Sequence, residues 1–195
     1  CGYGRNGSQA VTVLKKHKQP FLVVENNPIA IEEIKKHNPE LLLVVGDATH
    51  DEVLEEAGIQ TAQALITTLP SDSNNLFVVL SARSVNSSIK IISRASEDNS
   101  DKKLRIAGAN NVIMPDKIGG AHMASLVMKP DIIEFMDYIS AQSNIDINLE
   151  ELSFDVLPER FRGKSITEIG IRQLTGANII GLKRDDGAFE INPNP

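Results

Sequence analysis

The sequence is poor in several residue types whose scarcity narrows what the protein can be. It has a single cysteine and no tryptophan among 195 residues, and aromatic side chains make up 4% of it. One cysteine excludes an internal disulfide framework and fits a reducing compartment such as the cytoplasm. The four histidines form no metal motif with that cysteine. The sequence therefore predicts neither a disulfide-stabilised nor a zinc-dependent protein.

Two further deficits concern positive charge and long apolar segments. The net charge of −6 makes a nucleic-acid partner unfavourable. The richest apolar run, Leu41 to Val45, is far shorter than the roughly 20 residues that span a bilayer. The remaining composition, 41% hydrophobic and 24% charged, is that of an ordinary globular protein.

The most informative feature present is a glycine pattern at the N-terminus. Gly2, Gly4 and Gly7 have the spacing G-x-G-x-x-G, which in dinucleotide-binding folds forms the turn between a strand and a helix. Gly2 allows a tight turn, Gly4 allows backbone to approach a phosphate, and Gly7 allows the helix to pack closely on the strand. The N–H groups at the helix start then face the anion. Because this turn must follow a buried strand, we expect the natural chain to continue upstream of Cys1.

Apolar runs and helical patterns alternate over the 115 residues that begin with this motif. Such alternation predicts an α/β fold with a Rossmann-like, doubly wound parallel sheet. In such sheets, ligands bind at the carboxyl ends of the strands, near the switch in strand order. Strands are predicted at 21–24, 41–45, 62–67, 89–94 and 111–114, and helices at 8–16, 28–37, 49–57, 72–85 and 97–107.

Glu25 is the strongest candidate binding residue outside the glycine pattern. It follows Gly7 by 18 residues and ends a predicted strand, where a carboxylate accepts hydrogen bonds from adenosine ribose hydroxyls. Such a carboxylate repels a 2′-phosphate, so NAD or an adenine nucleotide is favoured over NADP. The alternative interpretation is a solvated glutamate at a strand end.

Other polar residues fall at the same expected edge of the sheet. Arg5 is either a phosphate ligand or a solvent-facing side chain. Asp47 either binds the adenine amino group or ribose, or serves the nearby helix start. Thr67 and Thr68 are expected to line the phosphate or second-nucleoside side, with Asn75 bracing their loop. The complete predicted set is Gly2, Gly4, Arg5, Asn6, Gly7, Glu25, Asn26, Asp47, Ala48, Thr67, Thr68, Leu69, Asn75 and Arg94.

The pattern changes after Pro115. We expect two apolar helices, 121–128 and 131–141, which form either a dimerisation arm or an ordinary capping pair. From about Asn144 onward the pattern indicates a small α+β lobe, with a strand at 152–156, a helix at 165–171 and a hairpin around 185–187. The expected organisation is thus 1–117, 118–143 and 144–195, with a C-terminal lobe that continues beyond Pro195.

The sequence offers nucleotide-binding groups but no evident catalytic group. No histidine lies in a recognisable acid–base pair, and Cys1 is placed in the strand preceding the loop. Three interpretations remain open: a nucleotide-sensing regulatory domain, the cofactor half of an NAD-dependent oxidoreductase, and a plain nucleotide-binding oligomerisation module.

Taken as a series, these motifs resemble the RCK domain, the regulator of potassium conductance, also known as the TrkA-type NAD-binding domain. The resemblance depends on Gly2–Gly7 with Glu25, on Gly46–Thr49, on Thr67–Asp72 and on Gly108–Ile113. The segment from Asn144 onward is similar to that family's C-terminal lobe.

The resemblance implies a regulatory module at the cytoplasmic face of the membrane, not an enzyme. It implies a homodimer that assembles into a gating ring below a potassium channel or transporter, whose membrane part we expect on the same polypeptide. The ligand is expected to be NAD(H) or ATP, ADP or AMP. Calcium-activated members carry carboxylates where this chain has Thr68, Arg94 and Ser96, so no metal site is expected. Arg94 is instead expected to meet a nucleotide phosphate or a neighbouring subunit's acid.

Overall fold

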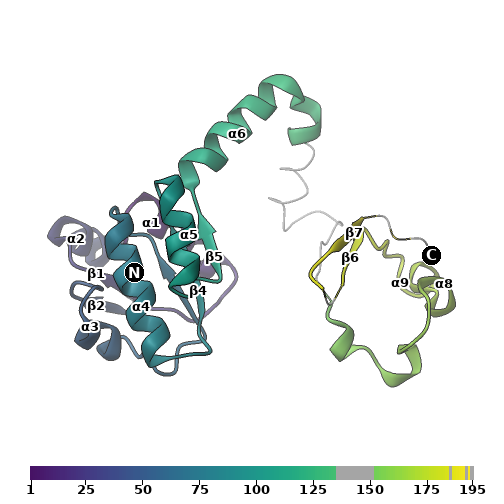
Figure 1. Cartoon of the computed structure of the whole chain (residues 1–195), viewed down its shortest axis with the longest axis horizontal. Coiled ribbons are helices and arrows are strands. Elements are labelled where there is room, and N and C mark those ends of the chain that lie inside the picture. The colour runs from purple at the N-terminus through teal and green to yellow at the C-terminus, as the bar shows by residue number, and fades with distance from the viewer. Residues whose placement is uncertain (135–151, 185, 192, 194–195) are drawn as a thin grey trace. The chain divides into compact units, whose positions relative to one another are not determined.

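The computed structural model describes residues 1–134, 152–184, 186–191 and 193. The chain divides into two compact units, Cys1–Glu134 and Phe135–Pro195, which are described separately. In the first unit helices and strands alternate, as Figure 1 shows. They are α1 Arg5–Lys16, β1 Val23–Glu25, α2 Pro28–His37, β2 Leu43–Val45, α3 Asp51–Glu56, β3 Ala64–Thr67, α4 Asp72–Val85, β4 Lys90–Arg94, α5 Asp98–Ile106, β5 Asn111–Ile113 and α6 Pro115–Met128.

The strands form two parallel sheets that the glycine segment joins. β1 pairs with β2, and β4 lies between β3 and β5. Between β1 and β3, the N–H of Gly2 donates to the carbonyl of Val24 at 2.8 Å, and the carbonyl of Cys1 accepts from the N–H of Thr68 at 2.9 Å. The order is therefore β2, β1, Cys1–Gly2, β3, β4, β5, and the strand order reverses at the glycine turn. This confirms the predicted doubly wound, Rossmann-like sheet.

Helices cover both faces of the sheet, because successive strand residues point to opposite sides. Val23 packs in one cluster with Val11 of α1 and Ile34 of α2. Its neighbour Val24 belongs to the larger cluster on the other face, which includes residues of α4 and α5 such as Val78 and Leu104. In Figure 1, α4 and α5 lie side by side over the β3–β5 sheet. The fold thus holds the glycine turn between two packed layers.

Helix starts are partly as predicted. Asn27 caps α2, and its side chain accepts from the N–H of Ile29 at 2.9 Å. Pro28 is the first helical residue, where its missing N–H costs nothing. The spacing of Thr49 and Glu52 predicts a capping box. This prediction is wrong, since His50 precedes α3 and Thr49 bonds to Asp47 instead. The helix itself forms as predicted.

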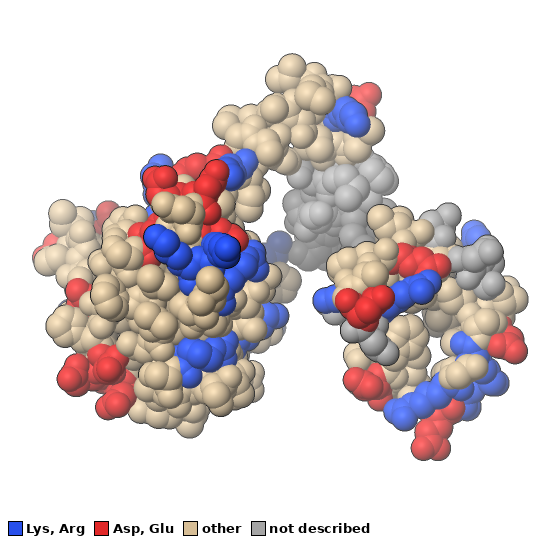
Figure 2. Space-filling view, in the orientation of Figure 1, with Lys and Arg blue, Asp and Glu red and all other residues tan. Residues whose placement is uncertain are grey.

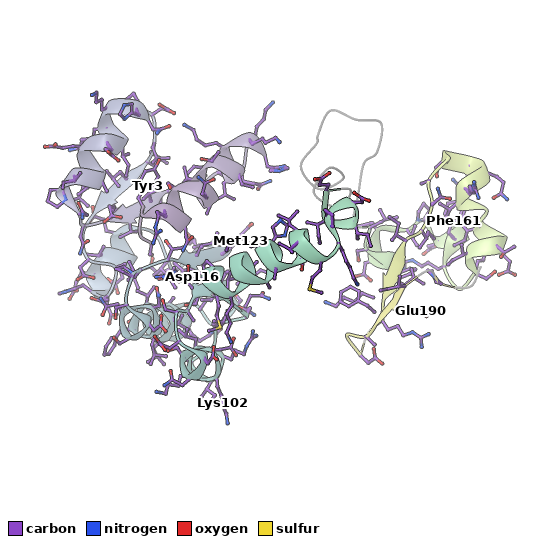
Figure 3. All side chains as sticks on the ribbon, turned by 90° about the horizontal axis from the view of Figure 1, so that it is seen from above. Tyr3, Lys102, Asp116, Met123, Phe161 and Glu190 are labelled. Atoms are coloured by element: carbon purple, nitrogen blue, oxygen red, sulfur yellow. The ribbon has the colours of Figure 1, made fainter. Side chains whose placement is uncertain are left out.

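α6 begins earlier than predicted. It starts at Pro115 and runs through Gly119 and Gly120, whereas the sequence pattern placed the start at Ala121. The predicted boundary at 117 therefore falls inside α6, and the first unit extends to Glu134. No residue of this helix, all of which is described, is buried. Figure 2 shows its surface as mostly uncharged, and Figure 3 shows the helix running from Asp116 past Met123.

The second unit contains short helices and a hairpin. Its elements are the 3₁₀ turns Phe154–Val156 and Glu159–Phe161, the helices α8 Ile166–Ile169 and α9 Ile171–Thr175, and the antiparallel strands β6 Gly181–Lys183 and β7 Phe189–Ile191. The spacing of Ser165 and Glu168 predicts a capping box, and the structure confirms it. The predicted strand at 152–156 is wrong, because a 3₁₀ turn occupies it. The predicted helix at 131–141 lies largely outside the described residues.

Candidate nucleotide-binding site

The glycine turn has the geometry that its spacing indicates. Gly2 has a φ of 86°, which disfavours any residue with a Cβ. A Cβ at Gly7 would lie 2.0 Å from the carbonyl oxygen of Gly2 and 2.9 Å from Oγ1 of Thr68, so α1 packs directly on the turn. A Cβ at Gly4 would have no atom within 4 Å and would point into open space. Gly2 and Gly7 are thus required by the fold, whereas Gly4 leaves the backbone accessible.

A small hollow lies beside this turn at the carboxyl ends of the strands. Its free volume is about 10 Å³, roughly that of one water molecule, so a nucleotide would lie across it rather than inside it. The sheet topology brings these residues together from three loops. The lining residues are Gly2, Val24, Glu25, Asn26, Gly46, Asp47, Ala48 and Leu69.

Glu25 ends β1 and is only 8% exposed. Its Oε1 accepts from the N–H groups of Asn26 at 2.9 Å and Asn27 at 2.8 Å. Its Oε2 accepts from the N–H of Tyr3, inside the glycine motif. The carboxylate therefore connects the end of β1 to the glycine turn, in addition to lining the hollow.

The start of α1 differs from those of its neighbours. The side chains of Asn27 and Ser71 accept N–H groups at the starts of α2 and α4. At α1 the N-cap is Gly4, so no side chain caps the helix, and its first turn contains no acidic residue. Arg5 is exposed there, its side chain makes no hydrogen bond or ion pair with any described residue, and Asn6 beside it is half-buried. This helix start offers donors and a cation to an anion.

Asp47 lies across the hollow, after β2. Its Oδ1 accepts from the N–H of Thr49 at 2.9 Å and from Oγ1 of Thr49 at 2.8 Å. These two bonds, the backbone one first, hold the pKa of Asp47 below its usual value. The carboxylate is therefore ionised at neutral pH. Ala48, which follows it, is buried.

Thr67 and Asn75 lie behind the site rather than in it. Both are fully buried, and Thr67 Oγ1 donates to Oδ1 of Asn75 at 2.7 Å. Asn75 also accepts from the N–H of Leu69 and donates to the carbonyls of Leu69 and Arg94. The side chain of Thr67 is thus committed to Asn75 and is not accessible to a ligand. Thr68 holds the turn itself, with Oγ1 donating to the carbonyls of Cys1 and Gly2.

Arg94 ends β4 on the far side of the same loop. Its guanidinium donates to the carbonyls of Leu69 at 3.2 Å and Pro70 at 3.4 Å. Its Nε is buried, with no hydrogen-bond partner in the described part of the chain. Arg94 therefore braces the loop through Nη1, and its buried Nε–H is left unused by the described residues.

Asp72, at the start of α4, fixes the neighbouring helix. Its carboxylate accepts from the N–H groups of Ser96 and Glu97, each at 2.9 Å, ahead of α5. Burial raises the pKa of Asp72, but hydrogen bonds from Glu97, Ser100 and Ser96, together with the charge of Arg94, lower it by more. Asp72 thus remains charged and organises the loops on the β4 side.

The structure brings six of the predicted residues together around the hollow: Gly2, Glu25, Asn26, Asp47, Ala48 and Leu69. Gly4, Arg5, Asn6 and Gly7 lie next to them at the start of α1. Thr67, Thr68, Asn75 and Arg94 instead support the loops. Sequence reasoning missed the lining residues Val24 and Gly46; the position of Gly46 directly after an apolar strand was the available signal. Among the described residues, no group of three His, Cys, Asp or Glu side chains could hold a metal ion.

Fold and site together define the class of the first unit: a Rossmann-like domain with a nucleotide-type glycine turn at the switch in strand order. The model of the TrkA-N domain matches residues 1–115, and the chain belongs to this family. The resemblance to RCK domains of potassium channel proteins is thereby confirmed.

Two curated relatives from Methanocaldococcus jannaschii are potassium channel proteins. "Probable potassium channel protein 2" is 38% identical and aligns with 100% of this chain and 58% of its own length. "Potassium channel protein 1" is 34% identical and aligns with 99% of this chain and 57% of its own length. The chain thus spans somewhat more than half of each relative. No helix within the described residues has the length and apolar character to cross a membrane.

Solved structures show the same fold. The TrkA-N domain of the inner membrane protein ybaL from Escherichia coli is 31% identical, with a TM-score of 0.60 over 64% of this chain and 91% of that one. The GsuK channel bound to NAD is 27% identical, with a TM-score of 0.58 over 100% of this chain and 32% of that one. GsuK bound to ADP is 30% identical, with a TM-score of 0.56 over 64% and 32%.

Proposed function

We propose that this chain is the cytoplasmic ligand-sensing domain of a potassium channel or transporter, and that NAD(H) or an adenine nucleotide (ATP, ADP or AMP) binds at its glycine turn. The observation that carries the proposal is the uncapped start of α1 beside the carboxylates of Glu25 and Asp47. Helix N–H groups and Arg5 suit phosphates, and the carboxylates suit ribose hydroxyls and an adenine amino group.

Ligand choice follows from the same groups. A carboxylate at the ribose position repels a 2′-phosphate, so the proposal excludes NADP. The GsuK structures with NAD and with ADP support both ligand types for this fold. The role is binding rather than catalysis, in keeping with relatives that are channel proteins.

Coupling to a pore requires assembly. We infer a homodimer that builds into a larger ring. We also infer a transmembrane part on the same polypeptide, because the matched relatives are potassium channel proteins that are longer than this chain. The apolar, uncovered surface of α6 supports the dimer. A tenfold preference of the ligand for one ring state supplies about 1.4 kcal/mol per site, and several sites add.

A nucleotide panel tests the proposal directly. Calorimetry of the purified chain with NAD, NADH, ATP, ADP, AMP and NADP is expected to show binding of at least one ligand other than NADP. Gly4→Ala is expected to weaken that binding at least tenfold, because the new Cβ points into the open space where a phosphate would approach the backbone. Failure of every ligand to bind, or tight binding of NADP alone, contradicts the proposal.

Arg5→Ala isolates the phosphate contact. We expect nucleotide affinity to fall about tenfold or more, as for the loss of a charge-assisted hydrogen bond, with the melting temperature unchanged. Lys16→Ala, at the opposite end of α1, is the matched control and is expected to bind normally. Unchanged affinity of Arg5→Ala by calorimetry refutes its phosphate role.

A further inference from the structure

The carboxylate of Glu25 has fewer free acceptor positions than a ribose diol requires. A carboxylate offers about four lone-pair positions, two on each oxygen. Oε1 uses both of its positions on the N–H groups of Asn26 and Asn27. Oε2 uses one on the N–H of Tyr3. A single acceptor position on Oε2 is left for a ligand.

The hydrogen bond from the N–H of Tyr3 makes the Glu25 side chain part of the glycine turn's hydrogen-bond network. Tyr3 lies between Gly2 and Gly4, and its own side chain packs against the cluster formed by α1, β1 and α2. The preceding N–H, that of Gly2, is held by the carbonyl of Val24. Two successive N–H groups of the turn are therefore fixed by the last two residues of β1, one through backbone and one through the Glu25 side chain.

We propose that Glu25 has two simultaneous roles: it anchors the glycine turn through Tyr3, and it offers only one hydrogen-bond position to one ribose hydroxyl. The second role depends on the proposed function, whereas the first does not. Binding both hydroxyls would break a bond to Tyr3, Asn26 or Asn27. The remaining hydroxyl therefore makes no hydrogen bond to Glu25.

The anchoring role is tested without nucleotide. In Glu25→Gln the amide has one oxygen and an NH₂ group, so in either orientation at least one of the three backbone N–H groups faces a donor. The melting temperature of the ligand-free chain is expected to fall by about 3–10 °C. Glu32→Gln, the same change at an exposed position on α2, is the control and is expected to melt like the wild type. Equal melting of both variants overturns the anchoring role.

The single-hydroxyl role is tested on the unmodified chain, so it does not depend on a variant that folds poorly. Calorimetry compares ADP with 2′-deoxy-ADP and 3′-deoxy-ADP. One analogue is expected to bind at least tenfold more weakly and the other within about threefold, since a hydrogen bond to a charged group is lost in only one case. Equal losses for both analogues, or none for either, overturn this role while leaving the proposed function intact. Failure of every nucleotide, ADP included, overturns the proposed function and the ribose contact together, and the melting comparison then still decides the anchoring role.

Discussion

Gly7→Ala is expected to destabilise the first unit by about 2–4 kcal/mol, or to prevent its folding. The new methyl group would lie 2.0 Å from the carbonyl oxygen of Gly2, a distance that no real contact of this kind shows. Backbone cannot rotate away as a flexible side chain would, because Gly2 is held by Val24. α1 would have to move off the turn. Urea unfolding followed by circular dichroism measures the loss.

Gly4→Ala is the matched control, since it makes the same chemical change three residues away. Gly4 has an extended backbone with a φ of −72°, and its Cβ would meet nothing within 4 Å. Its stability is expected to stay within about 1 kcal/mol of the wild type, the cost of alanine at an N-cap. The two glycines then separate fold from binding: Gly7→Ala loses stability, whereas Gly4→Ala keeps its stability but binds nucleotide poorly. Equal stability of the two variants contradicts this assignment.

Asn75→Ala is expected to cost about 3–5 kcal/mol, the second large effect. Asn75 is fully buried, and the oxygen and nitrogen of its amide hydrogen-bond to Thr67, Leu69 and Arg94. Its removal leaves the buried hydroxyl of Thr67 and the N–H of Leu69 without their acceptor, takes one donor from the carbonyls of Leu69 and Arg94, and opens a cavity. Because Leu69 lines the hollow, nucleotide affinity is expected to fall as well.

Asn74→Ala provides the comparison for this prediction. Asn74 is exposed on the same helix, one residue away, and the change is identical. Its stability is expected to stay within about 0.5 kcal/mol of the wild type in the same urea titration. A loss for Asn75→Ala no larger than that of Asn74→Ala would falsify the bracing role.

Most of the fold of the first unit could be predicted from sequence because strongly local signals mark it. Short apolar strands alternate with helices whose starts carry Asn27, Pro28 or Ser71, and these side chains act within one turn of their own position. The convergence of Gly2, Glu25 and Asp47 also follows from sequence, because the carboxyl ends of parallel strands share one edge.

What the sequence left open depends on which way a side chain turns. Thr67 and Thr68 are adjacent and identical in type. The side chain of Thr67 is nevertheless buried against Asn75, whereas that of Thr68 bonds to the glycine turn. Nothing in the local sequence distinguishes the two threonines, because the register of the strand decides which way each side chain points. The same holds for Thr49, whose hydroxyl bonds back to Asp47 rather than capping α3. At Phe154 the backbone itself differs, since a 3₁₀ turn replaces the predicted strand.

The exposed apolar surface of α6 has a consequence for how this protein behaves at different concentrations. Ile118, Met123, Val127 and Met128 are each at least 57% exposed. A helix that exposes several large apolar side chains and buries none is stabilised by a partner that covers them, so in the proposed dimer its order is linked to association. Amide hydrogen exchange in residues 115–128 should then slow as the protein concentration rises, while exchange in α4 stays constant. Dilution alone would then unfold α6 while α4 stays folded.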